Sequence, residues 1–155
     1  MKKLLSADQN SNGVNIALLI ARVGIAGLML THGVPKLLML LSGGQIQFPP
    51  IMGMSPELSL GFAVFAEVFC SLFILAGFAT RLAVVPLIIT MLIAVLSIHG
   101  AHPFTEPALQ YFLVYVILLF AGSGKYSVDY LLQNKTPKVN FSNRNLQDPT
   151  FSIYQ

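Results

Sequence analysis

Four long apolar runs alternate with short polar connectors along most of the chain. The runs cover approximately Val14–Leu41, Leu58–Phe78, Leu82–Ile98 and Ala108–Ala121. An α-helix needs about 20 apolar residues to cross the hydrocarbon core of a bilayer, and helices are one of the few structures that satisfy their backbone there. The pattern therefore predicts an all-α integral membrane protein, a four-helix bundle in which each run is one spanning helix.

The connectors contain residues that begin or reverse helices. The segment 42–57 is rich in glycine and proline, and near its end Ser55 and Pro56 are typical of a helix start, with serine as the cap. Thr80 and Arg81 lie in a very short connector between the second and third runs. These two helices should therefore be antiparallel neighbours.

A single membrane domain is expected between two polar ends. Residues 1–13 are predicted to be a cytoplasmic leader, residues 14–132 the four-span domain and residues 133–155 a polar C-terminal tail. The first run is too long for the core of a signal peptide and is expected to remain as a helix. The tail is rich in Asn, Ser, Gln and Lys, a composition that predicts exposure and permits disorder.

The charged residues support the interpretation as a membrane protein and predict its orientation in the membrane. Only 10% of the 155 residues are charged, against about 25% in a typical soluble domain. One side of the four-span pattern holds the basic residues Lys2, Lys3, Arg81, Lys125, Lys135, Lys138 and Arg144. By the positive-inside rule, both termini of a multi-pass protein of the bacterial inner (plasma) membrane should then face the cytoplasm. The basic residues form no continuous patch, so nucleic acid is not an expected partner.

Three ionisable residues, Arg22, His32 and Lys36, interrupt the first apolar run. At 100° per residue, Arg22, Gly33 and Lys36 fall on one helix face, which should point into the bundle. A charge at the bilayer centre costs about 2.5 to 3.5 kcal/mol on insertion scales, so it needs a partner, a polar cavity or a route to the interface. Lys36 can extend to the outer interface, whereas Arg22 requires a buried partner.

Glu67 is the only acidic residue inside any of the four runs. We therefore predict an Arg22–Glu67 ion pair between the first two helices. Two interpretations stay open: a structural pair that fixes helix packing, or a pair that borders a cavity and binds an anionic or quinone-like ligand, or titrates during a reaction. Tyr115, deep in the fourth run, needs a hydrogen-bond partner such as Glu67 or Thr90.

A second group of polar residues belongs to the predicted outer side. Its members are His32, Lys36, His99, His102 and Glu106. Imidazoles at a membrane interface are more often ordinary polar contacts than metal ligands, so we expect the mouth of a ligand pocket here and no metal site. With Cys70 as its single cysteine, the chain forms neither an internal disulfide nor a CxxC redox pair.

The order of several polar and glycine residues resembles a known family. These residues are Arg22, Gly33, Lys36, Glu67, Gly77, Thr80, Arg81, His99, Gly122, Ser123, Gly124, Ser127 and Asp129. Their positions are similar to those of the DoxX family, small bacterial four-helix membrane proteins, over about residues 16–132. Ser123 departs from the pattern, because family members often have proline there.

The resemblance implies a polar pocket with structural supports around it. The positions that the resemblance transfers are Arg22, Lys36, Glu67, Arg81 and His99. The polar pattern described above adds His32 and Tyr115, so the pocket residues expected are Arg22, His32, Lys36, Glu67, Tyr115 and His99. The supports expected are Gly33, Arg81, Ser127 and Asp129.

DoxX-like proteins include a subunit of an archaeal thiosulfate:quinone oxidoreductase, and others are linked to quinone resistance, thiol stress or membrane-bound oxidative-stress complexes. The expected function is accordingly that of a redox-associated membrane subunit handling a quinone or a small oxidised sulfur anion. The alternative is a non-enzymatic scaffold or assembly factor that anchors a soluble oxidoreductase. Membrane lipid, a quinone, and a protein partner or second copy of the chain are the expected partners, and no cofactor other than a quinone is implied.

Overall fold

The computed structural model describes residues 11–44, 46–51, 53–98 and 107–135, and every regular element in these ranges is a helix. The helices are α1 (Ser11–Leu41), α2 (Pro56–Val64), η2 (Phe65–Cys70), α3 (Ser71–Ala76), α4 (Thr80–Ile98), α5 (Pro107–Ala121) and α6 (Val128–Lys135). α2, η2 and α3 follow one another without a break and form one helical run of 21 residues. The all-α prediction is confirmed for these ranges, and the four apolar runs correspond to α1, α2–α3, α4 and α5.

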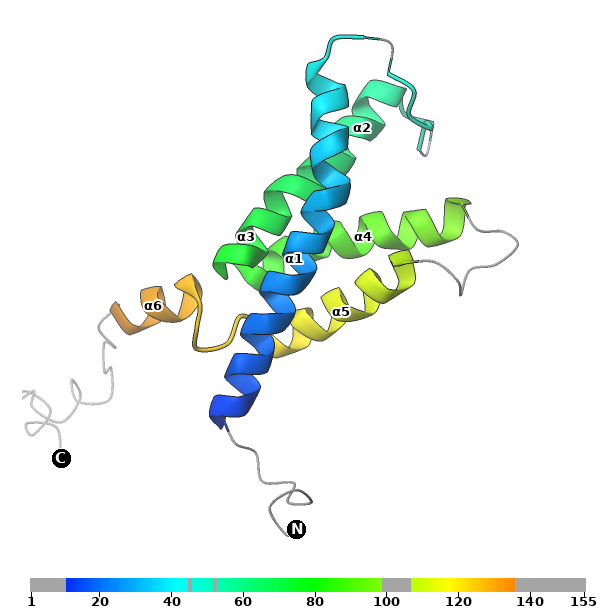
Figure 1. Ribbon diagram of the computed structural model, residues 1–155. Helices are drawn as coiled ribbons and strands as arrows, with labels where there is room; N and C mark the ends of the chain where they lie inside the picture. Colours follow the sequence, from blue (N-terminus) through cyan, green and yellow to red (C-terminus); the bar gives the residue numbers. More distant parts are fainter. Residues whose placement is uncertain (1–10, 45, 52, 99–106, 136–155) are drawn as a thin grey trace, which may run out of the picture.

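The helices are arranged as two pairs. α1 packs along α2, η2 and α3, while α4 packs along α5, and this second pair extends away from α1 at an angle (Figure 1). The buried core where the pairs meet contains small side chains, among them Ala26, Ala66, Cys70 and Ala83. Small residues let helix backbones approach closely. Such close packing stabilises helix contacts in a membrane, where the hydrophobic effect does not drive helices together.

Two helical segments, Asn12–Leu41 and Pro56–Ala76, are long and apolar enough to cross a membrane. The apolar segments Thr80–Leu96 and Ala108–Ala121 are shorter, so a crossing by α4 and α5 stays a prediction. Large apolar side chains on α1 are exposed, Ile20 among them. Such a surface suits contact with lipid better than contact with water.

The ends of several helices follow from local sequence. Ser55 caps α2 by accepting a hydrogen bond from the backbone N–H of Leu58 at 3.4 Å, and Pro56 is the first helical residue, as predicted. The turn between α3 and α4 differs from the prediction. It begins at Gly77, whose φ of 70° lets it end α3 in the left-handed conformation, and Thr80 and Arg81 already belong to α4.

Two elements were not expected from the sequence. The π-helix η2 interrupts the second apolar run at its centre, around Glu67. The short helix α6 follows the loop after α5 and extends past residue 132, the predicted end of the membrane domain.

Candidate functional site

An ion pair lies in the contact between α1 and η2. Lys36 Nζ donates a hydrogen bond to Glu67 Oε1 at 2.5 Å. The side chain of Glu67 is only 2% exposed, whereas that of Lys36 is 30% exposed. The Phe48 ring lies 5.8 Å from Lys36 Nζ, so the connector after α1 partly covers the ammonium group. The carboxylate is therefore internal, and the ammonium group approaches it from the edge of the structure.

Gly33 allows the helices to come close enough for this pair. A Cβ atom added at Gly33 would lie 2.8 Å from Val68 Cγ2 and 3.0 Å from Glu67 Cβ, closer than side chains normally approach. Lys36 follows Gly33 by three residues and therefore projects from the same face of α1. The close contact at Gly33 thus brings Lys36 within reach of Glu67.

The π-helix sets the direction of the Glu67 side chain. A π turn places an extra residue in an α-helix and is frequent at functional sites. Ala66, Glu67 and Val68 are all buried, although successive side chains of a regular helix diverge by 100°. The wider turn of η2 therefore directs a carboxylate into the core between two apolar side chains.

The predicted Arg22–Glu67 ion pair is wrong. Glu67 is paired with Lys36, and Arg22 Nη2 instead donates to the backbone carbonyl of Tyr126 at 2.6 Å. Gly33 lies against Glu67 while Arg22 lies against Gly77, so α1 and α2–α3 run antiparallel. Arg22 is then about 16 Å along α1 from the level of Glu67, at 1.5 Å per residue, too far to form the pair.

Arg22 instead belongs to a second polar group near the start of α1. Its side chain is 1% exposed, and it lies close enough to Asp129 for an electrostatic interaction. A Cβ atom at Gly77 would overlap the Arg22 guanidinium and lie 2.7 Å from Ser127 Cβ. Gly77 is therefore required both for its left-handed backbone and for the space that Arg22 occupies.

Asp129 joins α6 to the turn before α4. Its Oδ1 accepts a hydrogen bond from the backbone N–H of Ala79 at 2.7 Å, and its Oδ2 accepts one from Thr80 at 3.3 Å. The backbone N–H of Asp129 donates to the carbonyl of Gly77 at 3.0 Å. A carboxylate at the start of a helix satisfies free N–H groups and opposes the positive end of the helix dipole. These contacts give Arg22 and Asp129 an evident structural role.

Two buried hydroxyl groups lie near Glu67. Ser71 and Tyr115 are both 0% exposed, and Tyr115 lies beside Ser71 and within electrostatic reach of Glu67. Within the described part of the chain, Ser71 Oγ, Tyr115 Oη and Glu67 Oε2 have no hydrogen-bond partner. A buried polar group without a partner costs about 1 to 3 kcal/mol, so such groups usually interact with something in a native protein. We refer to Lys36, Glu67, Ser71 and Tyr115 as the Lys36–Glu67 cluster.

Aromatic rings connect this cluster to the surface between α1 and α5. The Tyr111 ring is stacked on Tyr115 with centroids 6.4 Å apart, and the His32 ring meets Tyr111 edge-on at 5.8 Å. His32 is exposed, Tyr111 is almost buried and Tyr115 is fully buried. The three rings therefore form a graded path from the surface to the Lys36–Glu67 cluster.

The structure brings together four of the predicted pocket residues, His32, Lys36, Glu67 and Tyr115, and separates Arg22 from them. His99, and with it the predicted outer partners His102 and Glu106, lies outside the described residues. Ser71 was not among the predicted pocket residues, and the structure adds it to the cluster. Its spacing from Glu67 in the sequence already put both residues on one helix face. Among the residues that the structure describes, no three His, Cys, Asp or Glu side chains are grouped as a metal site would require.

Comparison with known proteins gives one match. A family model described as DoxX matches residues 17–100, more than half of the chain. The matched range includes Lys36, Glu67 and Ser71 but ends before Tyr115. No curated protein and no solved structure matches the chain significantly.

Proposed function

The chain belongs to the DoxX family, which together with its long apolar helices indicates a membrane protein, and from this we propose that it is a redox-associated subunit of the bacterial inner membrane. In this proposal the Lys36–Glu67 cluster binds the head group of a quinone. One observation carries the proposal: Glu67 Oε2, Ser71 Oγ and Tyr115 Oη are buried without a hydrogen-bond partner in the described structure, and a π-helix directs Glu67 into the core.

The chemistry of the cluster suits a quinone. The carbonyl oxygens of a quinone accept hydrogen bonds, and the hydroxyl groups of Ser71 and Tyr115, which lie beside each other near Glu67, can turn to donate to such an oxygen. Quinone reduction consumes protons as well as electrons. The electrons for such a reduction must come from a redox partner protein.

The surroundings favour a quinone over a small sulfur anion. Lys36 could attract an anion, but its charge is already matched by Glu67 at 2.5 Å. The exposed His32 ring and the Tyr111 ring behind it provide aromatic contacts for a quinone ring, and aromatic pairs favour such stacked or edge-on contacts.

A non-enzymatic scaffold that anchors a soluble oxidoreductase is the second candidate. The observation in its favour is that the Lys36–Glu67 pair sits at the closest contact of α1 with η2, next to Gly33. A pair in this position can act as a structural connection between two helices, with no ligand involved.

Removing a hydroxyl group from the Lys36–Glu67 cluster distinguishes a quinone-binding subunit from a scaffold. We expect the purified protein in detergent to bind a short-chain ubiquinone in isothermal titration calorimetry, and Tyr115→Phe to weaken binding about fivefold, the effect of one lost hydrogen bond. Ser71→Ala should act in the same direction. Thermal unfolding should occur at an equal or higher temperature in both variants, because each removes a buried hydroxyl group that makes no hydrogen bond within the described structure.

Tyr126→Phe is the matched control, because the Tyr126 side chain is exposed and lies on the loop before α6, next to Arg22 rather than to the cluster. Quinone binding that is equal in all three variants would exclude this site. Wild-type protein that binds neither the ubiquinone nor thiosulfate would favour the scaffold.

A further inference from the structure

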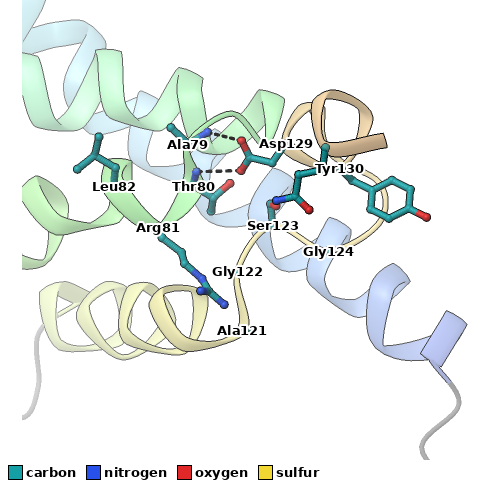
Figure 2. Close-up of a pocket in the computed structure, with 11 residues that line it drawn as sticks. Ala79, Thr80, Arg81, Leu82, Ala121, Gly122, Ser123, Gly124, Asp129 and Tyr130 are labelled. Carbon is teal, nitrogen blue, oxygen red and sulfur yellow. Dashed lines mark hydrogen bonds between the residues drawn. The ribbon is translucent and has the colours of Figure 1, made fainter. Parts of the chain in front are cut away.

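A cavity of about 470 Å³ lies at the opposite end of α1 from the Lys36–Glu67 cluster. The first turn of α4, the loop after α5 and helix α6 form its walls (Figure 2). Its volume is within the range of about 300 to 1,000 Å³ that is typical of small-molecule sites. The cavity shares no lining residue with the Lys36–Glu67 cluster, so a ligand bound here would be independent of the proposed quinone.

Arg81 and Asp129 are the two charged residues among those that line the cavity, and they are not equivalent. Both oxygens of Asp129 accept backbone hydrogen bonds from the start of α4, and its charge is opposed by the buried Arg22 behind it. The Arg81 guanidinium extends along Gly122 and gives one hydrogen bond, from Nη2 to the carbonyl of Phe120 at 3.3 Å (Figure 2). The Asp129 oxygens are occupied by backbone donors and its charge is offset in part by Arg22, so Arg81 is the charged group of the lining that is left to pair with a ligand.

Thr80 supplies a second feature that points to a ligand. It lines the cavity, is 0% exposed, and its Oγ1 has no hydrogen-bond partner in the described part of the chain. A hydroxyl donor next to a guanidinium group is a combination that binds oxyanions. A neutral or cationic ligand would leave the Arg81 charge without an opposite charge.

The composition of helix α6 suits a position at the level of lipid head groups. Tyr126, Tyr130, Leu131 and Leu132 are exposed apolar side chains on α6 and the loop before it. The adjoining Lys125 and Lys135 are also exposed. A short helix with exposed Tyr and Leu side chains and lysines at its ends is typical of a segment that lies in a membrane interface.

We propose that this cavity binds a phosphate group of net negative charge, with Arg81 pairing with the phosphate oxygens and Thr80 Oγ1 donating to them. Such a group reaches the protein either as the head group of an anionic phospholipid or as free phosphate. The apolar surface of α6 favours the lipid, because basic pockets between membrane helices are known sites for anionic head groups.

Native mass spectrometry of the full chain in detergent tests the site. A short-chain phosphatidylglycerol should bind in preference to a phosphatidylcholine of equal chain length. We expect Arg81→Gln to weaken phosphatidylglycerol binding about tenfold, the effect of losing one charge-assisted hydrogen bond, and Thr80→Val to weaken it about fivefold. Lys125→Gln removes an exposed charge from the same end without touching the cavity lining, so binding should change by less than about twofold.

Inorganic phosphate titrated calorimetrically distinguishes the two sources. Arg81-dependent binding of inorganic phosphate without binding of phosphatidylglycerol supports the site with free phosphate as its ligand. Equal binding of the two lipids without phosphate binding, or equal losses in Arg81→Gln and Lys125→Gln, overturns the proposal. Thr80→Val preserves the shape of the side chain, so it decides the matter if Arg81→Gln fails to fold.

Discussion

At the scale of single residues, Lys36 and Glu67 form an ion pair whose partners are unequally exposed. Glu67 cannot reach water, because its side chain is 2% exposed, whereas Lys36 is 30% exposed and has a long flexible stem. Breaking a buried pair is costly mainly through the charge that is left behind without compensation. The cost should therefore depend on which partner is removed.

We expect Lys36→Met to lower the free energy of unfolding by about 3 kcal/mol and Glu67→Gln by about 1 kcal/mol. The first change leaves a carboxylate in the core, and the second leaves an ammonium group that can turn towards the interface. Unfolding by SDS followed by circular dichroism in detergent measures both. The double variant should recover part of the loss, whereas equal losses in the two single variants would contradict the unequal exposure.

At the scale of helices, the contact between α1 and η2 depends on a residue with no side chain. Gly33 faces Val68 and Glu67 too closely for a Cβ atom, whereas an added Cβ at Gly27, on the same helix, would have no neighbour within 4 Å. Substituting Gly33 therefore tests the close contact between the helices, whereas substituting Gly27 tests only the preference of alanine over glycine within a helix.

Gly33→Ala should destabilise the protein by about 2 kcal/mol, because an added methyl group in a tight contact forces helices apart. Gly27→Ala should be neutral or stabilising by up to about 1 kcal/mol, because alanine favours a helix over glycine. SDS-induced unfolding again gives the measurement. A Gly33→Ala protein as stable as Gly27→Ala would show that α1 and η2 do not meet closely at Gly33.

Helices and their boundaries could be predicted from the sequence because their signals are local. The apolar runs and the Ser55 cap predict α1, α2–α3, α4 and α5 nearly as observed. The segment Phe65–Cys70 itself contains no proline or glycine that would mark a π-helix. α6 combines too few apolar residues to be recognised as a helix without its contacts to Gly77 and the start of α4.

The ion pair could not be predicted, because it depends on register between helices rather than on any one helix. Helical periodicity correctly put Arg22, Gly33 and Lys36 on one buried face, but it did not say which cation meets Glu67. That choice follows from two close contacts, Gly33 against Glu67 and Gly77 against Arg22. Neither contact is visible until α2–α3 is placed beside α1.

At the scale of the whole molecule, charge and shape make a joint prediction about orientation. α1 has 31 residues and is about 46 Å long, enough to cross a bilayer. Ser42 follows its end, whereas α6 lies towards the other end of the molecule (Figure 1). Arg81, Lys125 and Lys135 belong to the part of the chain around α6, while the connector 42–57 has no Lys or Arg. The positive-inside rule then places Ser42 outside and Lys125 in the cytoplasm.

Labelling with a membrane-impermeant maleimide tests this orientation. The native thiol is buried, and Cys70→Ala removes it entirely. In that background, Ser42→Cys should react in intact bacterial cells, whose outer membrane passes small reagents, and Lys125→Cys only after the inner membrane is permeabilised. The opposite labelling pattern would show that the protein has the inverse orientation in the membrane. Reaction of both in intact cells would place Ser42 and Lys125 on one side, which is incompatible with α1 crossing once, the loop 42–57 outside and α6 at the inner surface.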